Sequence, residues 1–528
     1  MKIKLTSRYF AYMGKHFPVM CSSGAFPLLP PVADAANRLD RFDDLSKKGI
    51  SRHVAKLTKF KRDFNAAESK AKTPEDRAVA NALALSASGA IAELDGIRSW
   101  QKSPEVYLQV AFTGLVQASE MPSKTEKERE KRFIKRLKAL PSLLAIAPHN
   151  IEAISTTSRG IAQTMVRDCA RYLTELGESD LGKNGKAPRF LQECLSALRD
   201  FDKFILVRPE LPEDEGPAFE DMLVNVAGTH RPANEIYAIA EKEYHSRLES
   251  LSWLESEIGS NWREAFTQYA GSAEEDIEAM DLVIREMHLL RAFIFDTALP
   301  GVFNDSPLRI EPQPQHLAST QRPIHYEPAL GAWDDEPSRC HISPQIFTGR
   351  GFRDDPTHLA RMRREYVFMA ARQSYPGRHL LDSQRRALKD SPMSQVTNPL
   401  FTAGWLSFAE NLLDELGYLT RPLDRLVHHQ RGLSRAALAM IDAGLAAGTL
   451  DQDKCLEILD GAGFSKKESL TRVRAIRLAP ASRVMPVLGL HELKKLRADS
   501  NLEISEFCKR IFAHGQIPLG RLTGLMQG

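Results

Sequence analysis

The sequence has few of the features that mark specialised classes of protein. Its six cysteines include no close pair among 528 residues, so neither a zinc ribbon nor a disulfide framework is indicated and a reducing, cytoplasmic location is expected. Cys194 and Cys508 also lack a neighbouring His-Asn pattern, which argues against a cysteine nucleophile.

Long hydrophobic runs are absent as well. No run of eighteen apolar residues occurs, so no membrane span is expected. The apolar stretch before Cys21 is broken by charged residues and by Pro18, and Met20 stands where a lipoprotein signal would need a small residue. Export is therefore not expected either.

The chain also lacks a strong excess of charge of either sign. It carries 71 basic and 68 acidic residues, a formal charge of +3, so composition gives no reason to expect nucleic acid as a partner. The Gly349-Arg350-Gly351 segment has neither a third glycine nor a following Lys-Ser/Thr pair, and nucleotide hydrolysis is unsupported.

The residues that are present favour a mainly α-helical fold. Apolar residues make up 43 % of the chain, and long stretches are rich in Ala, Leu, Glu, Lys and Arg. Apolar positions at helical spacing predict helices over 33–85, 90–97, 233–258, 273–295, 358–386 with a break at Pro376-Gly377, and 404–416.

Between residues 300 and 344 prolines are frequent and three short pieces favour strands: 308–310, 324–326 and 340–342. We expect a small sheet or hairpin there. We also expect two lobes around a deep cleft: an N-terminal helical lobe over 1–230 and a second lobe over 231–528, with the β-prone insert close to a site at 371–410.

That site is predicted from two segments. The first reads Ala371-Arg-Gln-Ser-Tyr-Pro-Gly-Arg-His-Leu380, and the second reads Ala403-Gly-Trp-Leu-Ser-Phe-Ala-Glu410. They resemble His-Glu-x-x-Pro-Gly-His and Glu-Gly-Trp-x-x-Tyr-x-Glu, which are carried by a large bacterial family, mostly of unknown function, related in outline to zinc carboxypeptidases and oligopeptidases.

The resemblance extends over most of the chain. Upstream it includes Trp100 with Pro104 and Tyr107, and Arg136-Leu137-x-x-Leu140-Pro141 leading to Ala147 and Asn150. Downstream it includes Arg435-Ala436 with Asp442 and Gly444, and Gly515-Gln-Ile-Pro-Leu519. It implies a large helical peptidase-like body.

The residues that would bind and use zinc are replaced. Arg372 and Arg378 stand in the places of the family's two histidines, Gln373 in the place of its catalytic Glu, and Ala403 in the place of the Glu before Gly-Trp. A guanidinium group has no lone pair to offer a metal, and an amide cannot act as a general base. The resemblance therefore implies a family member that has lost its zinc and retains no cofactor.

Two interpretations of the remaining polar residues stay open. Arg372 and Arg378 could replace the positive charge of the metal and bind a carboxylate or phosphate, or they could be neutralised internally by Glu410, Asp382 or Asp442. Glu410 lies two helical turns after Ala403 and is expected to pair with one of the two arginines. His379 is expected to be a hydrogen-bonded structural residue or a ligand-binding one, and Trp405 a core residue.

His325 and Tyr326, with His341, are further candidates for contact with an extended ligand, because they lie on β-prone pieces. The predicted function is that of a pseudoenzyme whose cleft retains a peptide, an acidic small molecule or a partner protein. One alternative is a metal-free enzyme acting on a small substrate through Arg372, Arg378, His379 and Glu410. Another is a zinc peptidase with relocated ligands from His325, His341 or His428-His429. The sequence does not indicate an oligomeric state.

Overall fold

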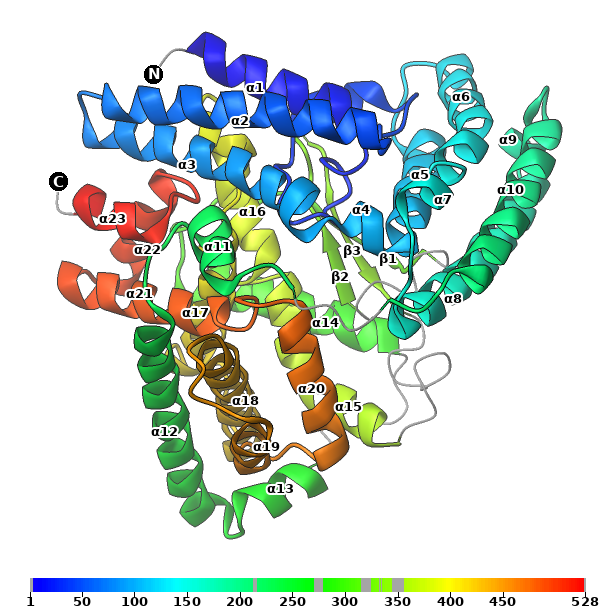
Figure 1. Ribbon diagram of the computed structural model, residues 1–528. Helices are drawn as coiled ribbons and strands as arrows, with labels where there is room; N and C mark the ends of the chain where they lie inside the picture. The colour runs from blue at the N-terminus through cyan, green and yellow to red at the C-terminus, as the bar shows by residue number, and fades with distance from the viewer. Residues whose placement is uncertain are drawn as a thin grey trace. The chain divides into compact units, whose positions relative to one another are not determined.

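The computed structural model describes residues 3–211, 216–269, 279–314, 324–331, 333, 335–343 and 356–526. These residues are mainly helical and include one three-stranded sheet (Figure 1), which confirms the predicted mainly α fold. The chain forms two compact units, each assembled from three segments. The first takes residues 1–64, 86–214 and 311–341, and the second takes 65–85, 215–310 and 342–528. The contiguous division at residue 230 and the deep cleft stay predictions.

The first unit is a set of packed helices that also holds most of the sheet. Contacts pair α5 with α6 and α8, and α10 with α6 and α8. Its helices are α1 (Ile3–His16), η1 (Ala33–Arg38), most of α2 (Lys47–Ser69), the end of α3 (Pro74–Ile91), η2 (Ala92–Ile97), α4 (Ser99–Lys102), α5 (Pro104–Glu120), α6 (Glu126–Leu144), α7 (Ala147–Asn150), α8 (Thr156–Glu178), α9 (Asp180–Lys183) and α10 (Ala187–Val207).

The N-terminal segment belongs to the core of this unit. Tyr9, Met13 and Phe17 are fully buried, and the Tyr9 hydroxyl shares a hydrogen bond of 3.0 Å with that of Ser86. The helix predicted to run from residue 33 is interrupted at residues 39–46, where the Asp44 side chain accepts hydrogen bonds from the amide and the hydroxyl of Ser46. Side chains that bond to backbone amides in this way favour turns over continued helix.

The three predicted β pieces all form strands. They are β1 (Leu308–Pro312), β2 (Ile324–Glu327) and β3 (Ser338–Ile342), and they pair in the order β1-β3-β2. β3 is therefore the middle strand, so its side chains lie between those of the two others. The predicted closeness of this sheet to segment 371–410 stays a prediction.

The second unit contains the helices that carry the candidate site. Its two most extensive helix pairs are α12 with α18 and α17 with α21. The elements are α11 (Phe219–Met222), η3 (Leu223–Ala227), α12 (Ala233–Ile258), α13 (Trp262–Gln268), α14 (Ala279–Ala292), η4 (Phe293–Ala298), α15 (Pro356–Gln373), α16 (Arg378–Ala387), η6 (Pro392–Gln395), α17 (Pro399–Glu415), α18 (Pro422–Ala446), α19 (Gln452–Gly461), α20 (Lys466–Leu478), α21 (Met485–Ser500), α22 (Ile504–Ala513) and α23 (Leu519–Met526).

Two local features position α17. The Asn398 side chain accepts a hydrogen bond of 2.8 Å from the Phe401 amide, and Pro399 follows at the first helical position, where its missing N–H costs nothing. Further along, a Cβ atom on Gly404 would lie 2.6 Å from the backbone of Gly489, so only glycine allows α17 and α21 to approach this closely.

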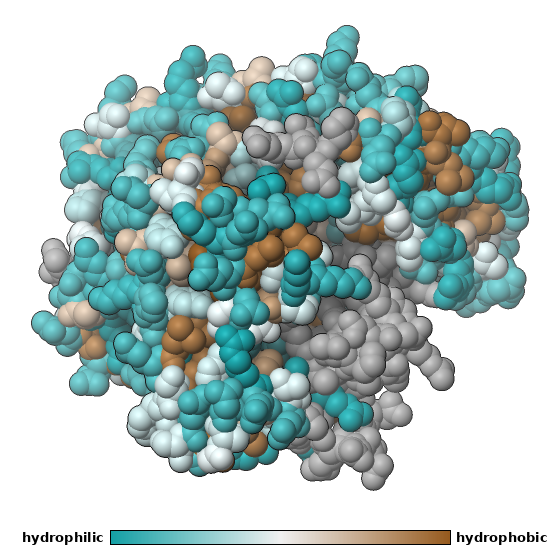
Figure 2. Space-filling model, turned by 60° about the horizontal axis from the view of Figure 1, so that its bottom comes forward, coloured by the Kyte–Doolittle hydropathy of each residue, from teal (hydrophilic) through white to brown (hydrophobic). Residues whose placement is uncertain are grey.

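A helix that spans a membrane must be long and apolar, and none of the described helices meets both requirements. On the face shown in Figure 2, hydrophilic residues predominate and hydrophobic residues form scattered patches.

Candidate functional site

The predicted break at Pro376-Gly377 separates α15 from α16 and orients Arg372. A Cβ atom on Gly377 would lie 2.3 Å from the carbonyl oxygens of Ala371 and Arg372, so this close turn requires glycine. The indole of Trp405 is fully buried and donates a hydrogen bond of 2.9 Å to the Pro376 carbonyl. Trp405 thus ties the turn to α17, in agreement with its predicted role in the core.

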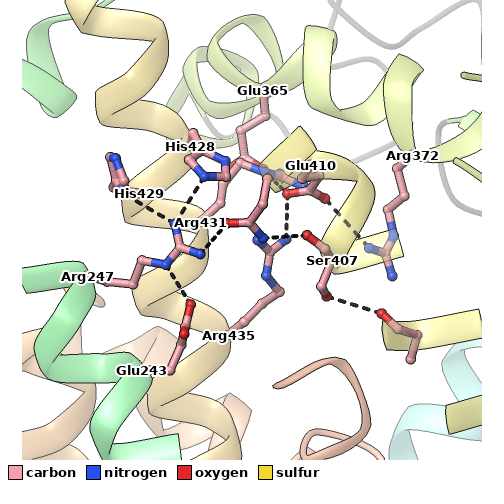
Figure 3. A network of polar contacts seen from close by, with 12 residues as sticks. Glu243, Arg247, Glu365, Arg372, Ser407, Glu410, His428, His429, Arg431 and Arg435 are labelled. Carbon is pink, nitrogen blue, oxygen red and sulfur yellow. Dashed lines mark hydrogen bonds and ion pairs between the residues drawn. The ribbon is translucent and has the colours of Figure 1, made fainter. Parts of the chain in front are cut away.

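Glu410 on α17 is the centre of an arginine-rich cluster (Figure 3). Its carboxylate is 3.7 Å from Arg372 Nη1, 3.1 Å from Arg431 Nη2 and 2.6 Å from Arg435 Nη1. The predicted ion pair of Glu410 with Arg372 is therefore confirmed. Burial opposes the charge of Glu410, but Arg431, Arg435 and Arg372 outweigh burial and hold its pKa well below the usual range.

Arg431 links this carboxylate to a second one. Its guanidinium also bonds to Glu365 of α15 and lies over the Phe368 ring, 5.3 Å from the ring centroid. Burial favours the neutral guanidine, but Glu410 and Glu365 raise the pKa of Arg431 above its usual value. Ion pairs thereby connect α15, α17 and α18.

A fourth arginine, Arg247 on α12, bonds to the neighbouring histidines. Its Nη1 donates to His428 Nε2 at 3.0 Å and to His429 Nδ1 at 3.2 Å. Its Nη2 donates to Asn411 and its Nε to Glu243. Both imidazoles accept through these nitrogens and must be neutral, since a protonated ring has no lone pair.

The electrostatics agree with neutral rings. Burial, reinforced by Arg247, lowers the pKa of His428 well below its usual value and that of His429 to about 4. Because His428 accepts through Nε2, its proton is assigned to Nδ1. These two histidines are committed to a guanidinium, so they do not form the relocated zinc site considered above.

Two nitrogen donors in this cluster lack an acceptor. Arg435 Nη2 and His428 Nδ1 are buried, and neither has a hydrogen-bond partner among the described residues. The other terminal nitrogen of Arg435, Nη1, donates a hydrogen bond to Glu410. Burial lowers the pKa of Arg435, and the charge of Glu410 opposes this shift. Leaving a buried charged donor unsatisfied is costly, so the cluster is incomplete in acceptors.

The remaining predicted residues of segment 371–410 lie in other environments. Arg378 is half-buried at the start of α16, and no contact with Glu410 is seen. His379 is fully buried and its Nε2 bonds to the Ser306 carbonyl at 3.0 Å, while its ring meets Tyr375 edge-on. The burial and the hydrogen bond agree with a structural role for His379, and its role in binding a ligand stays a prediction.

The two other acids proposed as neutralisers each have a described partner. Asp382 bonds to Arg385 at 2.8 Å, one turn along α16. Asp442 accepts from the backbone amides of Ala481 and Arg483, at 2.9 and 2.8 Å, and holds the turn before α21. The described ion pair of Arg372 is with Glu410.

The donor set does not fit zinc. Gln373 is buried, Ala403 has no ligand atom in its side chain, and Arg372 directs a cation at Glu410. Across the described part of the chain, no three His, Cys, Asp or Glu side chains are grouped so that they could hold a metal ion. A divalent ion beside three guanidinium groups would also meet strong repulsion.

His325 and Tyr326 belong to β2 in the first compact unit, whereas Glu410 belongs to the second. The Tyr326 hydroxyl donates to the Ser338 hydroxyl at 2.8 Å and is buried. The His325 ring lies 6.4 Å from that of His341, measured between centroids. The contact of these residues with an extended ligand stays a prediction.

The sequence interpretation missed Arg431, Arg247 and Glu365 as members of the cluster. One signal was available: Arg431 and Arg435 are four residues apart, a spacing that places two side chains on the same face of a helix. Nothing local indicated Glu365 or Arg247, which reach the cluster from α15 and α12.

The similarity of this chain to known proteins extends over most of its length. The family described as "Bacterial protein of unknown function (DUF885)" matches residues 32–526. No curated protein matches. The fold is similar to that of a "putative lipoprotein of unknown function" from Shewanella oneidensis, with TM-score 0.66, 15 % identity and coverage of 93 % of this chain and 94 % of that one. It is also similar to a "putative lipoprotein" from Colwellia psychrerythraea, with TM-score 0.71, 12 % identity and coverage of 99 % of both.

Proposed function

The chain belongs to the bacterial family of unknown function DUF885, and from that premise we propose that it is a metal-free binding protein for a carboxylate-bearing ligand, a peptide or a small acid. In this proposal it is a pseudoenzyme of a peptidase-like fold. The ligand's carboxylate is bound in the Glu410 cluster, by the arginines that stand beside the degenerate segment.

The buried Nη2 of Arg435 carries the proposal, because this charged donor has no acceptor in the described chain. The second open donor, His428 Nδ1, has the same polarity, so both would be satisfied by oxygen acceptors. A carboxylate offers two such oxygens and matches a guanidinium in charge and geometry. A cationic ligand would satisfy neither donor.

The replacement of the metal ligands supports the same conclusion. Where the resemblance places a zinc-binding imidazole, Arg372 supplies a permanent positive charge that needs no metal. Glu410 neutralises only part of the guanidinium charge gathered around it. An incoming carboxylate would therefore find cations already oriented, which lowers the entropic cost of binding.

The location that we propose is the cytoplasm. Cleavage before Cys21, as in a lipoprotein, would remove the buried side chains of Tyr9, Met13 and Phe17 from the core. All six cysteines are buried and unpaired, as expected in a reducing compartment. A chain lacking residues 1–20 is expected to unfold at lower temperature than the full chain, or not to fold, and thermal unfolding measures this.

The binding proposal is tested by titration calorimetry with N-acetyl-dialanine and with its C-terminal amide as the matched uncharged probe. We expect the free carboxylate to bind and the amide not to bind. Arg435→Gln should weaken binding by about tenfold or more, because a hydrogen bond to a charged group is lost. Arg435→Lys keeps the charge but not the guanidinium fork and should be intermediate.

Arg421→Gln is the control, since Arg421 pairs with Asp424 in an exposed position at the start of the same helix. It should leave binding unchanged. Equal binding of acid and amide, or no binding of the acid to the wild type, would refute the proposal. So would near-stoichiometric zinc, measured by elemental analysis of protein purified without chelator and offered zinc.

A further inference from the structure

His341 occupies the middle strand of the small sheet and faces an acid on each side. Its Nε2 is 3.8 Å from a carboxylate oxygen of Glu311 on β1 and 3.9 Å from one of Glu327 on β2. Its side chain is only 4 % exposed, and its Nδ1 is buried without a hydrogen-bond partner among the described residues. Both Nε2 distances are too long for hydrogen bonds, although charged groups at these distances attract.

The charged groups around His341 are mostly acids. Arg339, two residues earlier on β3, is 3.8 Å from Glu120 at the end of α5. Glu336, just before β3, accepts a hydrogen bond from the Gly331 amide. Among the described residues, the groups that act on His341 or on its acids include Glu120, Glu311, Glu327, Glu336 and Arg339, with the His325 ring nearby. With a neutral imidazole, these described groups comprise four acids and one arginine.

Burial and mutual repulsion make this arrangement retain a proton. Burial raises the pKa of Glu327 to about 7; Arg339 opposes this, and Glu311 and Glu120 add to it. Burial lowers the pKa of His341 to about 4, against the attraction of Glu311. His341 Nε2 and the Glu327 carboxylate are 3.9 Å apart, and ionisable groups that interact strongly titrate in steps that belong to the pair.

We propose that His341, Glu311 and Glu327 form a proton-operated clasp across the three strands, closed when one proton is shared between His341 and Glu327. The proton comes from solvent, and no covalent bond other than N–H or O–H changes. Held on either group, it creates an N–H···O or O–H···N hydrogen bond between β3 and β2. When the proton is on the imidazole, the charged ring also attracts the Glu311 carboxylate of β1.

The direction of the pH response follows from Glu327. Its folded-state pKa lies above its value in an opened sheet, so the stabilisation is present at low pH and is lost as the pH rises through about 7. An opened-state value of 4.5 and a closed-state value of about 7 give a closing equilibrium that weakens by about tenfold between pH 6 and pH 8.

Hydrogen exchange read by mass spectrometry tests the clasp on the full chain, with EDTA present so that metal ions do not contribute. The readout is the protection factor of a peptide covering residues 336–343, corrected for the intrinsic effect of pH on exchange. We expect the wild type to be about tenfold better protected at pH 6 than at pH 8. Peptides from α17 should show no comparable change.

Two variants separate the clasp from a general loss of structure. Glu327→Gln carries no titrating proton, so its β3 peptide should be equally protected at both pH values. Glu120→Gln removes a more exposed acid of the same group and should keep the wild-type dependence on pH. Equal protection of the wild type at pH 6 and pH 8, or a pH response that persists in Glu327→Gln, would overturn the proposal.

Discussion

Glu410 and Glu327 are both buried glutamates, yet the structure drives them in opposite directions. Three arginines surround Glu410 and hold it ionised, whereas Glu327 shares one arginine with three other acids, and its pKa rises to about 7. Burial penalises both carboxylates alike. The balance of the neighbouring charges therefore decides whether a buried carboxylate becomes a fixed anion or a proton carrier.

The comparison extends to the histidines near each acid. His428 and His429 accept hydrogen bonds from Arg247 and are held neutral by a cation, so they cannot respond to pH near neutrality. His341 faces two carboxylates, and no arginine among the described residues donates a hydrogen bond to it. These differences support our proposals that the Glu410 cluster binds an anion at constant charge and that His341, Glu311 and Glu327 exchange a proton.

The same substitution at the two acids should have opposite effects, and the larger one is at Glu410. Glu410→Gln leaves buried guanidinium groups without a counter-charge and should lower the free energy of unfolding by about 3–5 kcal/mol at pH 7. Urea denaturation measures this. Glu415→Gln, which breaks a more exposed pair with Arg497, should cost less than about 1 kcal/mol. Equal effects of the two variants would refute the central role of Glu410.

Glu327→Gln should instead stabilise the protein at pH 8. A neutral amide avoids burying a charge that the fold disfavours, so the free energy of unfolding should rise by about 1–3 kcal/mol at pH 8 and change little at pH 5. Urea denaturation at both pH values tests the sign. A loss of stability at pH 8 would mean that Glu327, like Glu410, stabilises the fold as an anion, and would refute the contrast between the two acids.

Arg372→Gln should have a smaller effect than the loss of Glu410. Arg431 and Arg435 stay closer to the carboxylate than Arg372, so Glu410 should remain ionised and the cost should be about 1 kcal/mol. The stability that depends on ionised Glu410 is present above its unfolded-state pKa and is lost as the pH falls. Acid unfolding of Arg372→Gln should accordingly begin at a slightly higher pH than in the wild type.

Arg339→Gln should change the pH at which the hydrogen exchange of β3 responds. Arg339 is the cation that opposes the rise in the pKa of Glu327, so its removal should move the midpoint of the exchange response upward, by about one pH unit or less. The hydrogen-exchange series on the β3 peptide gives this midpoint. A downward shift would contradict the assignment of the proton to Glu327 and His341.

Local patterns predicted most of the secondary structure and part of the site. The helix over 233–258, the break at Pro376-Gly377 and all three strands were predicted, because helical periodicity and proline positions are local properties. The pair of Arg372 with Glu410 was also anticipated from spacing. Glu365 and Arg247 were not, since no spacing rule connects α15 or α12 to α17.

The sequence by itself determined which chemistry segment 371–410 can perform: the side chains of Arg372, Gln373, Arg378 and Ala403 cannot supply a zinc site, whatever the fold around them. Only the tertiary structure decided which charges meet. It placed Arg431 and Arg435 on Glu410, and His341 between Glu311 and Glu327. The physical reason is that charge interactions depend on distance and burial, which helix packing and strand order set and which no local stretch of sequence contains.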